Sequence, residues 1–172
     1  MKLISRKDWD AKSPSADYTR LDSTRGVKIH YTGGKVPANL ADNDRHDRCA
    51  ELIRDMQAMH MAGGRGEKYI DLAYNLVVCP HRRVFMGRGP HALPAANGRG
   101  LNSGHYAVLA LLGSSGLTKP NDEMLNGLVD AIEYLRERGD AGREVKGHRD
   151  GYDTSCPGDA LYTWVRSGAE RP

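Results

Sequence analysis

Apolar side chains recur at helical spacing early in the chain. The segment 45–61 carries an apolar residue every three or four positions, and Gly63-Gly64 follows it, so the pattern predicts an amphipathic helix that ends at these glycines. The methionines on this face are expected to fill the core. The apolar positions are Cys49, Leu52, Ile53, Met56 and Met59 or His60.

The same period appears twice more towards the end of the chain. The segment 118–139 predicts a second helix, which we expect Thr118 to cap and the glycine at its end to close. The segment 159–166 predicts a terminal helix, and the tail after Arg166 is expected to fray. The inward positions are Met124, Leu125, Leu128, Ala131, Ile132, Leu135, Leu161, Trp164 and Val165.

Short runs of apolar and β-branched residues predict strands between these helices. The run 105–112 is almost continuously apolar, which is typical of a central strand covered on both faces. A turn at 80–82 joins two other runs as a hairpin. The predicted strands are 27–31, 72–79, 83–86, 105–112 and 144–146.

The remaining segments are polar or rich in Gly and Pro. Residues 1–26 are expected to be irregular, with Trp9 as their one large anchor, and 87–104 to form a long loop of functional importance. Strands and helices alternate, so we predict a mixed α/β fold. One domain, 1–172, would hold a central, mostly mixed β-sheet flanked by helices.

The composition indicates which kinds of partner this protein is expected to have. The chain is 39% hydrophobic and 27% charged, with a net charge of +3, which fits contact with an anionic surface such as a bacterial wall. Lys and Arg are scattered rather than gathered in a stripe, so nucleic acid is not an expected partner. No apolar run reaches membrane-span length, and the first residues lack the apolar core of an export signal, so we expect no membrane insertion and a cytoplasmic location.

Three residues far apart in the sequence have the chemistry of metal ligands. His148 and Cys156 lie in one loop, 147–158, that is too rich in Gly and Pro to be a helix. His30 ends the apolar run 27–31. Three ligands of this kind bind Zn²⁺ and leave a fourth position open, as catalytic zinc sites do.

Two hydroxyl groups are candidates for the remaining chemistry. Tyr74 lies among small and apolar residues, and its hydroxyl is a candidate oxyanion donor, although a Tyr packed at the end of a sheet fits the same pattern. Thr154 is close enough to Cys156 to place its hydroxyl beside a metal-bound water, although Thr is also an ordinary turn residue.

The other histidines and cysteines have simpler interpretations. His91 and His105 flank the long loop and could reach the site, whereas no role is expected for the remaining three histidines. For the two remaining cysteines we favour buried free thiols, and a disulfide between them stays open. These last residues are His46, His60, His81, Cys49 and Cys79.

Several segments together resemble the type 2 N-acetylmuramoyl-L-alanine amidase family, which includes amidase-type phage lysozymes and peptidoglycan recognition proteins. The resemblance spans about residues 4–165 and follows the order of the family. The matching segments are 4–9, 27–34, 70–75, 86–89, 100–102, 147–150 and 154–158.

The resemblance implies a role for each matching residue. His30, His148 and Cys156 would bind zinc in a surface groove, Tyr74 would be catalytic, and Thr154 would help to stabilise the transition state. Contacts to substrate are implied for Arg88, Asn97 and Asn102. The family often has His at the position of Asn97, so a proton-transfer or substrate contact is expected to be altered here.

The resemblance also implies an activity. We expect hydrolysis of the amide between N-acetylmuramic acid and the L-alanine of the stem peptide, by a monomeric phage endolysin acting on bacterial peptidoglycan. A cytosolic amidase that recycles soluble muropeptides and a non-catalytic receptor are the alternatives, although such receptors generally lack the metal-binding Cys. A cysteine peptidase using Cys156 and His148 is less consistent with the order of these residues.

Overall fold

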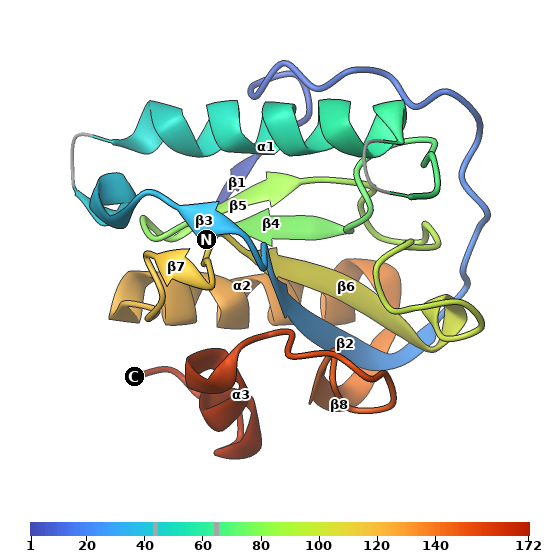
Figure 1. Cartoon of the computed structure of the whole chain (residues 1–172). Coiled ribbons are helices and arrows are strands. Elements are labelled where there is room, and N and C mark those ends of the chain that lie inside the picture. Colours follow the sequence, from blue (N-terminus) through green and yellow to red (C-terminus); the bar gives the residue numbers. More distant parts are fainter. Residues whose placement is uncertain (43–44, 64–65) are drawn as a thin grey trace.

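A six-stranded mixed sheet forms the centre of the molecule in the computed structural model, which describes residues 1–42, 45–63 and 66–172 (Figure 1). The strand order is β1-β5-β4-β6-β2-β8, in which β4 and β5 form an antiparallel hairpin and the other neighbouring strands are parallel. These strands are β1 (Lys2–Ile4), β2 (Thr24–Tyr31), β4 (Leu76–Val78), β5 (Arg83–Met86), β6 (His105–Ala110) and β8 (Ala141–Gly147).

Helices cover both faces of this sheet. In Figure 1, α1 (His46–Ala62) lies on one side, while α2 (Asp122–Gly139) lies on the other, and α3 (Asp159–Arg166) lies near β8. A small parallel pair, β3 (Lys35–Val36) and β7 (Ser115–Gly116), and two short 3₁₀ helices, Ala38–Ala41 and Asn102–Gly104, complete the structure. The predicted mixed α/β fold is confirmed.

The two-residue period of the strands divides the core into two layers. On β6, Val108 packs with α2, whereas Leu109 packs with the α1 layer. All six residues of β6 are buried, as predicted for a central strand. On β2, Val27 and Ile29 belong to the α2 layer, so the next side chain, His30, points towards the other face.

That other face is covered only in part. Helix α1 packs on residues of β4, β5 and β6 and lies away from β2 and β8 in Figure 1. Loops rather than a helix therefore surround the end of β2 that carries His30, and this leaves room for a site.

Helix α1 ends as predicted at its first glycine. Gly63 adopts a left-handed conformation, with φ of 78°, and its backbone N–H bonds to the carbonyl oxygen of Met59. Gly64, the second glycine of the predicted stop, lies outside the described residues. In the described parts of the chain no helix combines the length and the apolar character needed to cross a membrane.

Several predicted boundaries were wrong. The segment 1–26 contains β1, which pairs with β5, and β2 begins at Thr24. The strand predicted at 72–79 is only Leu76–Val78, and the Asn75 side chain, just before it, donates hydrogen bonds to the carbonyl oxygens of Gly89 and Ala92 on another loop. The strand predicted at 144–146 is seven residues long.

The predictions for the ends of the last helices also need correction. Asn121, not Thr118, caps α2, and its side-chain oxygen accepts a hydrogen bond of 2.9 Å from the backbone N–H of Met124. The tail after Arg166 is held in place. Ala169 is buried, and the Arg171 guanidinium donates hydrogen bonds to Asp130 and Glu133.

Candidate metal centre

The three predicted metal ligands meet at one end of the sheet. Strands β2 and β8 are parallel and pair Ile29 with Gly147, so His30 and His148, the next residues, leave the sheet side by side. Their ring centroids are 4.5 Å apart, and Cys156 Sγ lies 3.7 Å from His30 Nδ1. One ligand atom from each residue lies within 4.8 Å of the other two. We call these three residues the metal centre.

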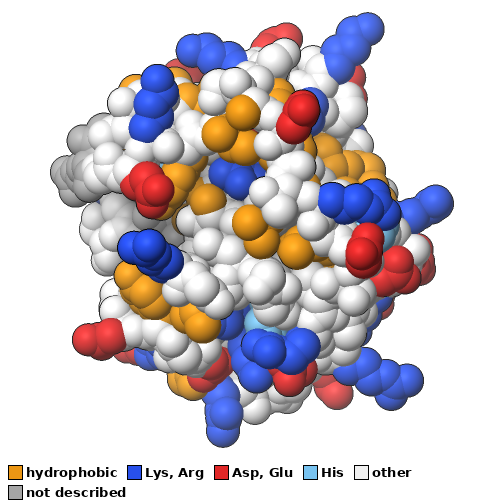
Figure 2. Space-filling model, turned by 90° about the vertical axis from the view of Figure 1, so that its right-hand side faces the viewer, with side chains coloured by type: hydrophobic (Ala, Val, Ile, Leu, Met, Phe, Trp, Pro, Cys, Tyr) orange, Lys and Arg blue, Asp and Glu red, His pale blue; other side chains and the backbone are white. Residues whose placement is uncertain are grey.

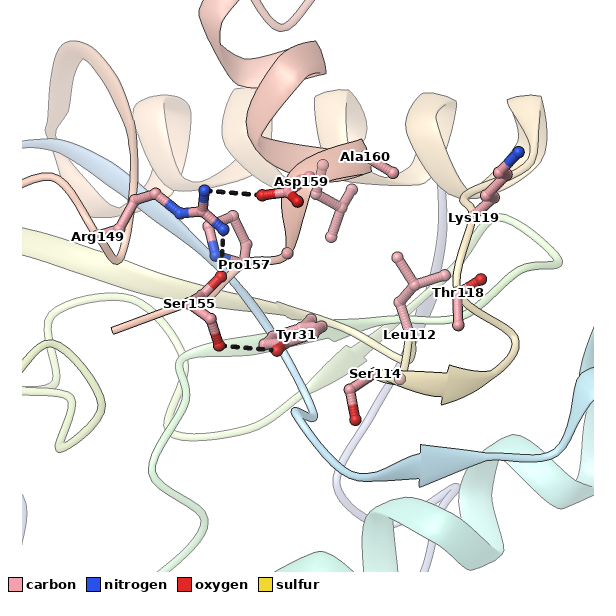
Figure 3. A pocket seen from close by; sticks show the side chains of 13 residues that line it. Tyr31, Leu112, Ser114, Thr118, Lys119, Arg149, Ser155, Pro157, Asp159 and Ala160 are labelled. Carbon is pink, nitrogen blue, oxygen red and sulfur yellow. Dashed lines mark hydrogen bonds and ion pairs between the residues drawn. The ribbon is translucent and has the colours of Figure 1, made fainter. Parts of the chain in front are cut away.

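The loop after β8 brings Cys156 back to the two histidines. The backbone N–H of Arg149 bonds to the Cys156 carbonyl oxygen at 3.0 Å, which closes the loop. Arg149 also donates hydrogen bonds to the Ser155 carbonyl oxygen and, at 2.9 Å, to Asp159 (Figure 3). The Thr154 hydroxyl accepts a hydrogen bond of 3.2 Å from the Cys156 N–H. These bonds fix the position of the sulfur.

Asn97 determines which nitrogen of His30 faces the sulfur. Its side-chain N–H donates to the His105 carbonyl oxygen at 2.7 Å, so its side-chain oxygen accepts from His30 Nε2 at 2.9 Å. A neutral imidazole that donates through Nε2 keeps the lone pair on Nδ1, which is the atom nearest Cys156. Such outer partners orient metal-binding histidines.

The backbone of the same residue holds the second histidine. A hydrogen bond between the backbone of Asn97 and the His148 ring leaves the other ring nitrogen free. That nitrogen, Nε2, is buried and has no hydrogen-bond partner in the described parts of the chain. A buried, unsatisfied acceptor is costly, and a metal ion would satisfy it.

Burial keeps the imidazoles of His30 and His148 neutral at pH 7, and the neutral ring is the form that binds a metal ion. Burial, followed by repulsion from His148, lowers the pKa of His30 to about 3, and burial lowers the pKa of His148 to about 4. Burial raises the pKa of the Cys156 thiol to about 11, so this sulfur needs a cation to become a thiolate at neutral pH.

The separation of the ligand atoms also fits zinc. Tetrahedral zinc with sulfur at about 2.3 Å and nitrogen at about 2.0–2.1 Å places these two atoms about 3.6 Å apart. The observed distance between Cys156 Sγ and His30 Nδ1 is 3.7 Å. The donor set, its spacing and the unsatisfied nitrogen of His148 therefore all fit a zinc ion.

Tyr74 lies beside this centre. Its ring meets that of His30 edge to face, with centroids 5.4 Å apart. The chain around it is fixed by a bond from the Ala73 N–H to His60 Nδ1 and by one from the Arg88 N–H to the Tyr74 carbonyl oxygen. Burial raises the pKa of the Tyr74 hydroxyl, so this group is a proton donor at neutral pH. Sequence analysis gave His60 no role, although its place in the last turn of α1 positions Tyr74.

A pocket of about 640 Å³ adjoins the centre. Tyr152, which lines it, stacks on His148 with ring centroids 4.9 Å apart, and the missing side chain of Gly98 makes this possible, because a Cβ there would lie 2.6 Å from the Tyr152 ring. Arg88 and Asn102, two predicted substrate contacts, also line this pocket. Sequence analysis missed Tyr152, whose aromatic character in a Gly-rich loop was the available signal.

Asn97, the third predicted substrate contact, is placed differently. Its side chain is fully buried, and its backbone N–H donates to the side-chain oxygen of Asn102 at 2.8 Å. Asn97 is thus placed to orient the histidines of the metal centre, and its contact with substrate stays a prediction.

A second pocket, of about 300 Å³, is lined in part by Ser155 and Pro157, the residues on either side of Cys156 in the sequence (Figure 3). It is also lined by Tyr31, whose hydroxyl is 3.2 Å from that of Ser155. On the face in Figure 2, hydrophobic side chains form separate small groups among mixed basic and acidic ones.

The other candidates lie elsewhere. His91 Nδ1 is 2.9 Å from the Leu21 carbonyl oxygen, and His105 Nε2 is 2.7 Å from a carboxylate oxygen of Glu144, so neither belongs to the metal centre. Cys49 and Cys79 are buried free thiols, as favoured from the sequence.

Comparisons with known proteins agree with this geometry. No protein-family model matches the chain. It is 31% identical to peptidoglycan-recognition protein 1 of Holotrichia diomphalia over 168 residues, which cover 96% of this chain and 79% of that protein. It is 34% identical to the N-acetylmuramoyl-L-alanine amidase of Mus musculus over 142 residues, or 81% of this chain and 25% of that protein.

A solved structure shows the same fold. Peptidoglycan recognition protein-LE, determined in complex with tracheal cytotoxin, superposes with a TM-score of 0.80 at 24% identity and covers 96% of this chain and 92% of that one. This likeness shows the fold, and the sequence relatives show the class. The chain belongs to the family of peptidoglycan-recognition proteins and type 2 N-acetylmuramoyl-L-alanine amidases. The resemblance stated from the sequence is confirmed.

Proposed function

We propose that this protein is a zinc-dependent amidase. Its substrate would be the amide that joins the lactyl group of N-acetylmuramic acid to the L-alanine of the stem peptide. The observation that carries the proposal is the metal centre itself, in which two oriented imidazoles and a thiol converge beside an open pocket. One buried ring nitrogen there has no partner among the residues that the structure describes.

Each residue has a part in this reaction. Bound here, zinc would supply a Lewis acid for a carbonyl and a water-derived nucleophile at neutral pH. The Tyr74 hydroxyl, beside His30, would donate a hydrogen bond to the oxygen that gains negative charge. Water adds to the carbonyl, the C–N bond breaks, the lactyl carbonyl becomes a carboxylate, and the L-alanine nitrogen leaves as an amine that gains a proton.

Thr154 would help to position Cys156. Its hydroxyl accepts the N–H of Cys156, so it holds the ligand loop in place. The Thr154 hydroxyl keeps its own hydrogen for donation. From this position beside Cys156, it would donate that hydrogen to the transition state, as predicted.

The larger pocket would take the stem peptide. Arg88 and Arg99 outnumber the one acidic residue of its lining, Glu67, and Asn102 and Tyr69 give it hydrogen-bonding groups. Such a lining suits a peptide that carries carboxylates. The similar recognition protein in complex with tracheal cytotoxin, a monomeric diaminopimelic acid-type peptidoglycan, supports this substrate class.

A receptor without activity is the second candidate, because many of the relatives are named recognition proteins. Cys156 favours the enzyme, since a groove that only binds peptide has no need of a buried thiol between two oriented imidazoles. Peptidoglycan fragments would remain the partner of a receptor, so binding alone does not separate the two functions.

Metal content and product analysis test the proposal. Cys156→Ser should remove the zinc of the metal centre and most activity, while the adjacent Ser155→Ala should retain both. Chelation should abolish the release of new L-alanine amino termini from peptidoglycan, seen by mass spectrometry, and zinc should restore it. Wall binding without such release would establish the receptor instead, and resistance to chelators would favour a thiol nucleophile.

For the biological role we propose a monomeric phage endolysin that stays in the cytoplasm until the host lyses. A recycling amidase that acts on soluble muropeptides is the alternative. Rates on intact sacculi and on soluble fragments distinguish them, because an endolysin should act on intact walls.

A further inference from the structure

A second group of potential metal ligands lies at the other end of α1. Cys49, in the first turn of this helix, Cys79, after β4, and His81, in the β4–β5 turn, place one ligand atom each within 4.8 Å of the other two. Both cysteines are completely buried and are free thiols. We call this group the thiol cluster.

The distances in the thiol cluster match those of a tetrahedral site. His81 Nδ1 is 3.6 Å from Cys49 Sγ and 3.7 Å from Cys79 Sγ. Zinc bound to sulfur and nitrogen in a tetrahedron separates these atoms by about 3.6 Å. The metal centre shows the same separation, 3.7 Å, between Cys156 and His30.

The orientation of His81 is that of a metal ligand. Its Nε2 lies 2.9 Å from the Asp42 carbonyl oxygen, which can only accept a hydrogen bond. The hydrogen of a neutral ring is therefore on Nε2, and the lone pair of Nδ1 points towards the two sulfurs. A second nitrogen bonded to a backbone carbonyl is the usual way in which proteins orient a metal-binding histidine.

A fourth ligand is available from the same helix. The His46 ring meets that of His81 edge to face, with centroids 4.6 Å apart, and His46 precedes Cys49 by one helical turn. His46 Nδ1 is buried and has no hydrogen-bond partner among the described residues. His46 lies outside the three residues whose ligand atoms already meet, so its ring would have to rotate to bring Nδ1 to a shared ion.

We propose that Cys49, Cys79 and His81, closed by His46, form a second zinc site with a structural role. Four protein ligands leave no place for substrate, as in structural zinc sites. The ion would connect the start of α1 to the β4–β5 hairpin, which lie together in Figure 1. It would secure the helix whose last turn carries His60 beside Tyr74. The thiolates favour zinc over Mg²⁺ or Ca²⁺.

Metal stoichiometry tests this site separately from the proposed activity. Protein purified with a reductant and loaded with zinc should hold two ions per chain, Cys156→Ser one, and Cys156→Ser combined with Cys79→Ala and His81→Ala none. His81→Ala alone should keep one ion and the amidase activity. Cys156→Ser should lose the activity yet keep its remaining ion, so failure of either proposal is recognised independently.

Two further measurements do not depend on activity. In the Cys156→Ser background, zinc at about 100 times its Kd should raise the melting temperature by roughly 5–10 °C. Cobalt should give a thiolate charge-transfer band that disappears with Cys79→Ala. Cys156→Ser protein that binds no zinc and melts at the same temperature with or without it would overturn the site. So would purified protein that is two hydrogens lighter because Cys49 and Cys79 form a disulfide.

Discussion

Asn97 controls more of the metal centre than any other residue that is not a ligand. Its side chain bonds to His30 and its backbone to the His148 ring. We expect Asn97→Ala to weaken zinc binding on the order of 10–100-fold, because His30 loses its orienting partner and the loop of Asn97 loses an internal hydrogen bond. Competition with a chromogenic chelator measures this, with Asn126→Ala on α2 as control. Unchanged zinc affinity in a folded Asn97→Ala protein would show that the histidines need no such partner.

Tyr74 lies beside His30 and can donate a hydrogen bond to a developing oxyanion without carrying charge. Tyr74→Phe keeps the ring and its edge-to-face contact with His30, so we expect normal zinc content. Turnover should fall on the order of 100-fold or more, because one oxyanion donor is lost. Steady-state rates with soluble muropeptide provide the measurement. Tyr134→Phe, on the far face of the sheet, is the matched control. Equal rates for all three proteins would leave Tyr74 with a packing role.

The three ligands could be predicted from the sequence because their chemistry and local setting are visible there. His30 ends an apolar run, and His148 and Cys156 share one Gly-rich loop. The role of Asn97 could not be predicted, because it depends on where the long loop closes against the His105 carbonyl oxygen. The same is true of His60, whose contact with the Ala73 N–H joins the end of a helix to a distant turn.

At the scale of elements, one carboxylate joins the N-terminal segment, α1 and the turn that carries Tyr74. Asp71 is fully buried and accepts hydrogen bonds from the Tyr18 hydroxyl, from Gln57 at 2.6 Å and from the Leu72 N–H at 2.7 Å. The Arg6 guanidinium lies 2.8 Å away. Burial by itself raises the pKa of Asp71, but these partners outweigh it and lower the pKa.

We expect Asp71→Asn to destabilise the fold by about 3–5 kcal/mol, because it leaves Arg6 without its buried partner and turns an acceptor into a donor. Urea denaturation at pH 7 measures this change. Asp10→Asn, an exposed carboxylate in the same segment, should change the free energy of unfolding by less than about 0.5 kcal/mol. Similar small effects of both substitutions would mean that the Asp71 network is not a major source of stability.

The ends of helices and strands could be predicted where neighbouring residues in the sequence determine them. They could not be predicted where contacts with distant segments determine them. The glycine after α1 and the hairpin of β4 and β5 follow local patterns. The short β4 does not, because it begins only after Asn75, whose side chain bonds to Gly89 and Ala92 on another loop. At the start of α2, Thr118 and Asn121 are both good caps, and only the position of the hairpin, whose Pro80 carbonyl oxygen bonds to Asn121, decides between them.

At the scale of the molecule, partial cover of one sheet face creates the site. Helix α1 covers the part of this face formed by β4, β5 and β6, whereas loops surround the end of β2 that carries His30 (Figure 1). The parallel pairing of β2 with β8 brings together two histidines that are distant in the sequence. Periodicity predicts the strands but not their order, so the position of this uncovered part was not available from the sequence.

A carboxylate on α2 also connects the β4–β5 hairpin to the C-terminal tail. Asp130 accepts hydrogen bonds of 2.8 Å from Arg82 in the hairpin and from Arg171 in the C-terminal tail. Burial alone raises the pKa of Asp130, but these two guanidinium groups outweigh it and lower the pKa to about 2. Because the folded state has the lower pKa, its extra stability is complete above the unfolded value near 3.8 and is lost as the pH falls towards about 2.

We therefore expect Asp130→Asn to cost about 2 kcal/mol at pH 7 and progressively less between about pH 4 and pH 2. Urea titrations of both proteins across this range give the difference in free energy of unfolding at each pH. Asp17→Asn removes the same charge from an exposed position and should cost far less at pH 7. A difference for Asp130→Asn that stays constant down to pH 2 would mean that the ion pairs do not stabilise the fold. The tail and the hairpin would then be held on α2 by packing alone.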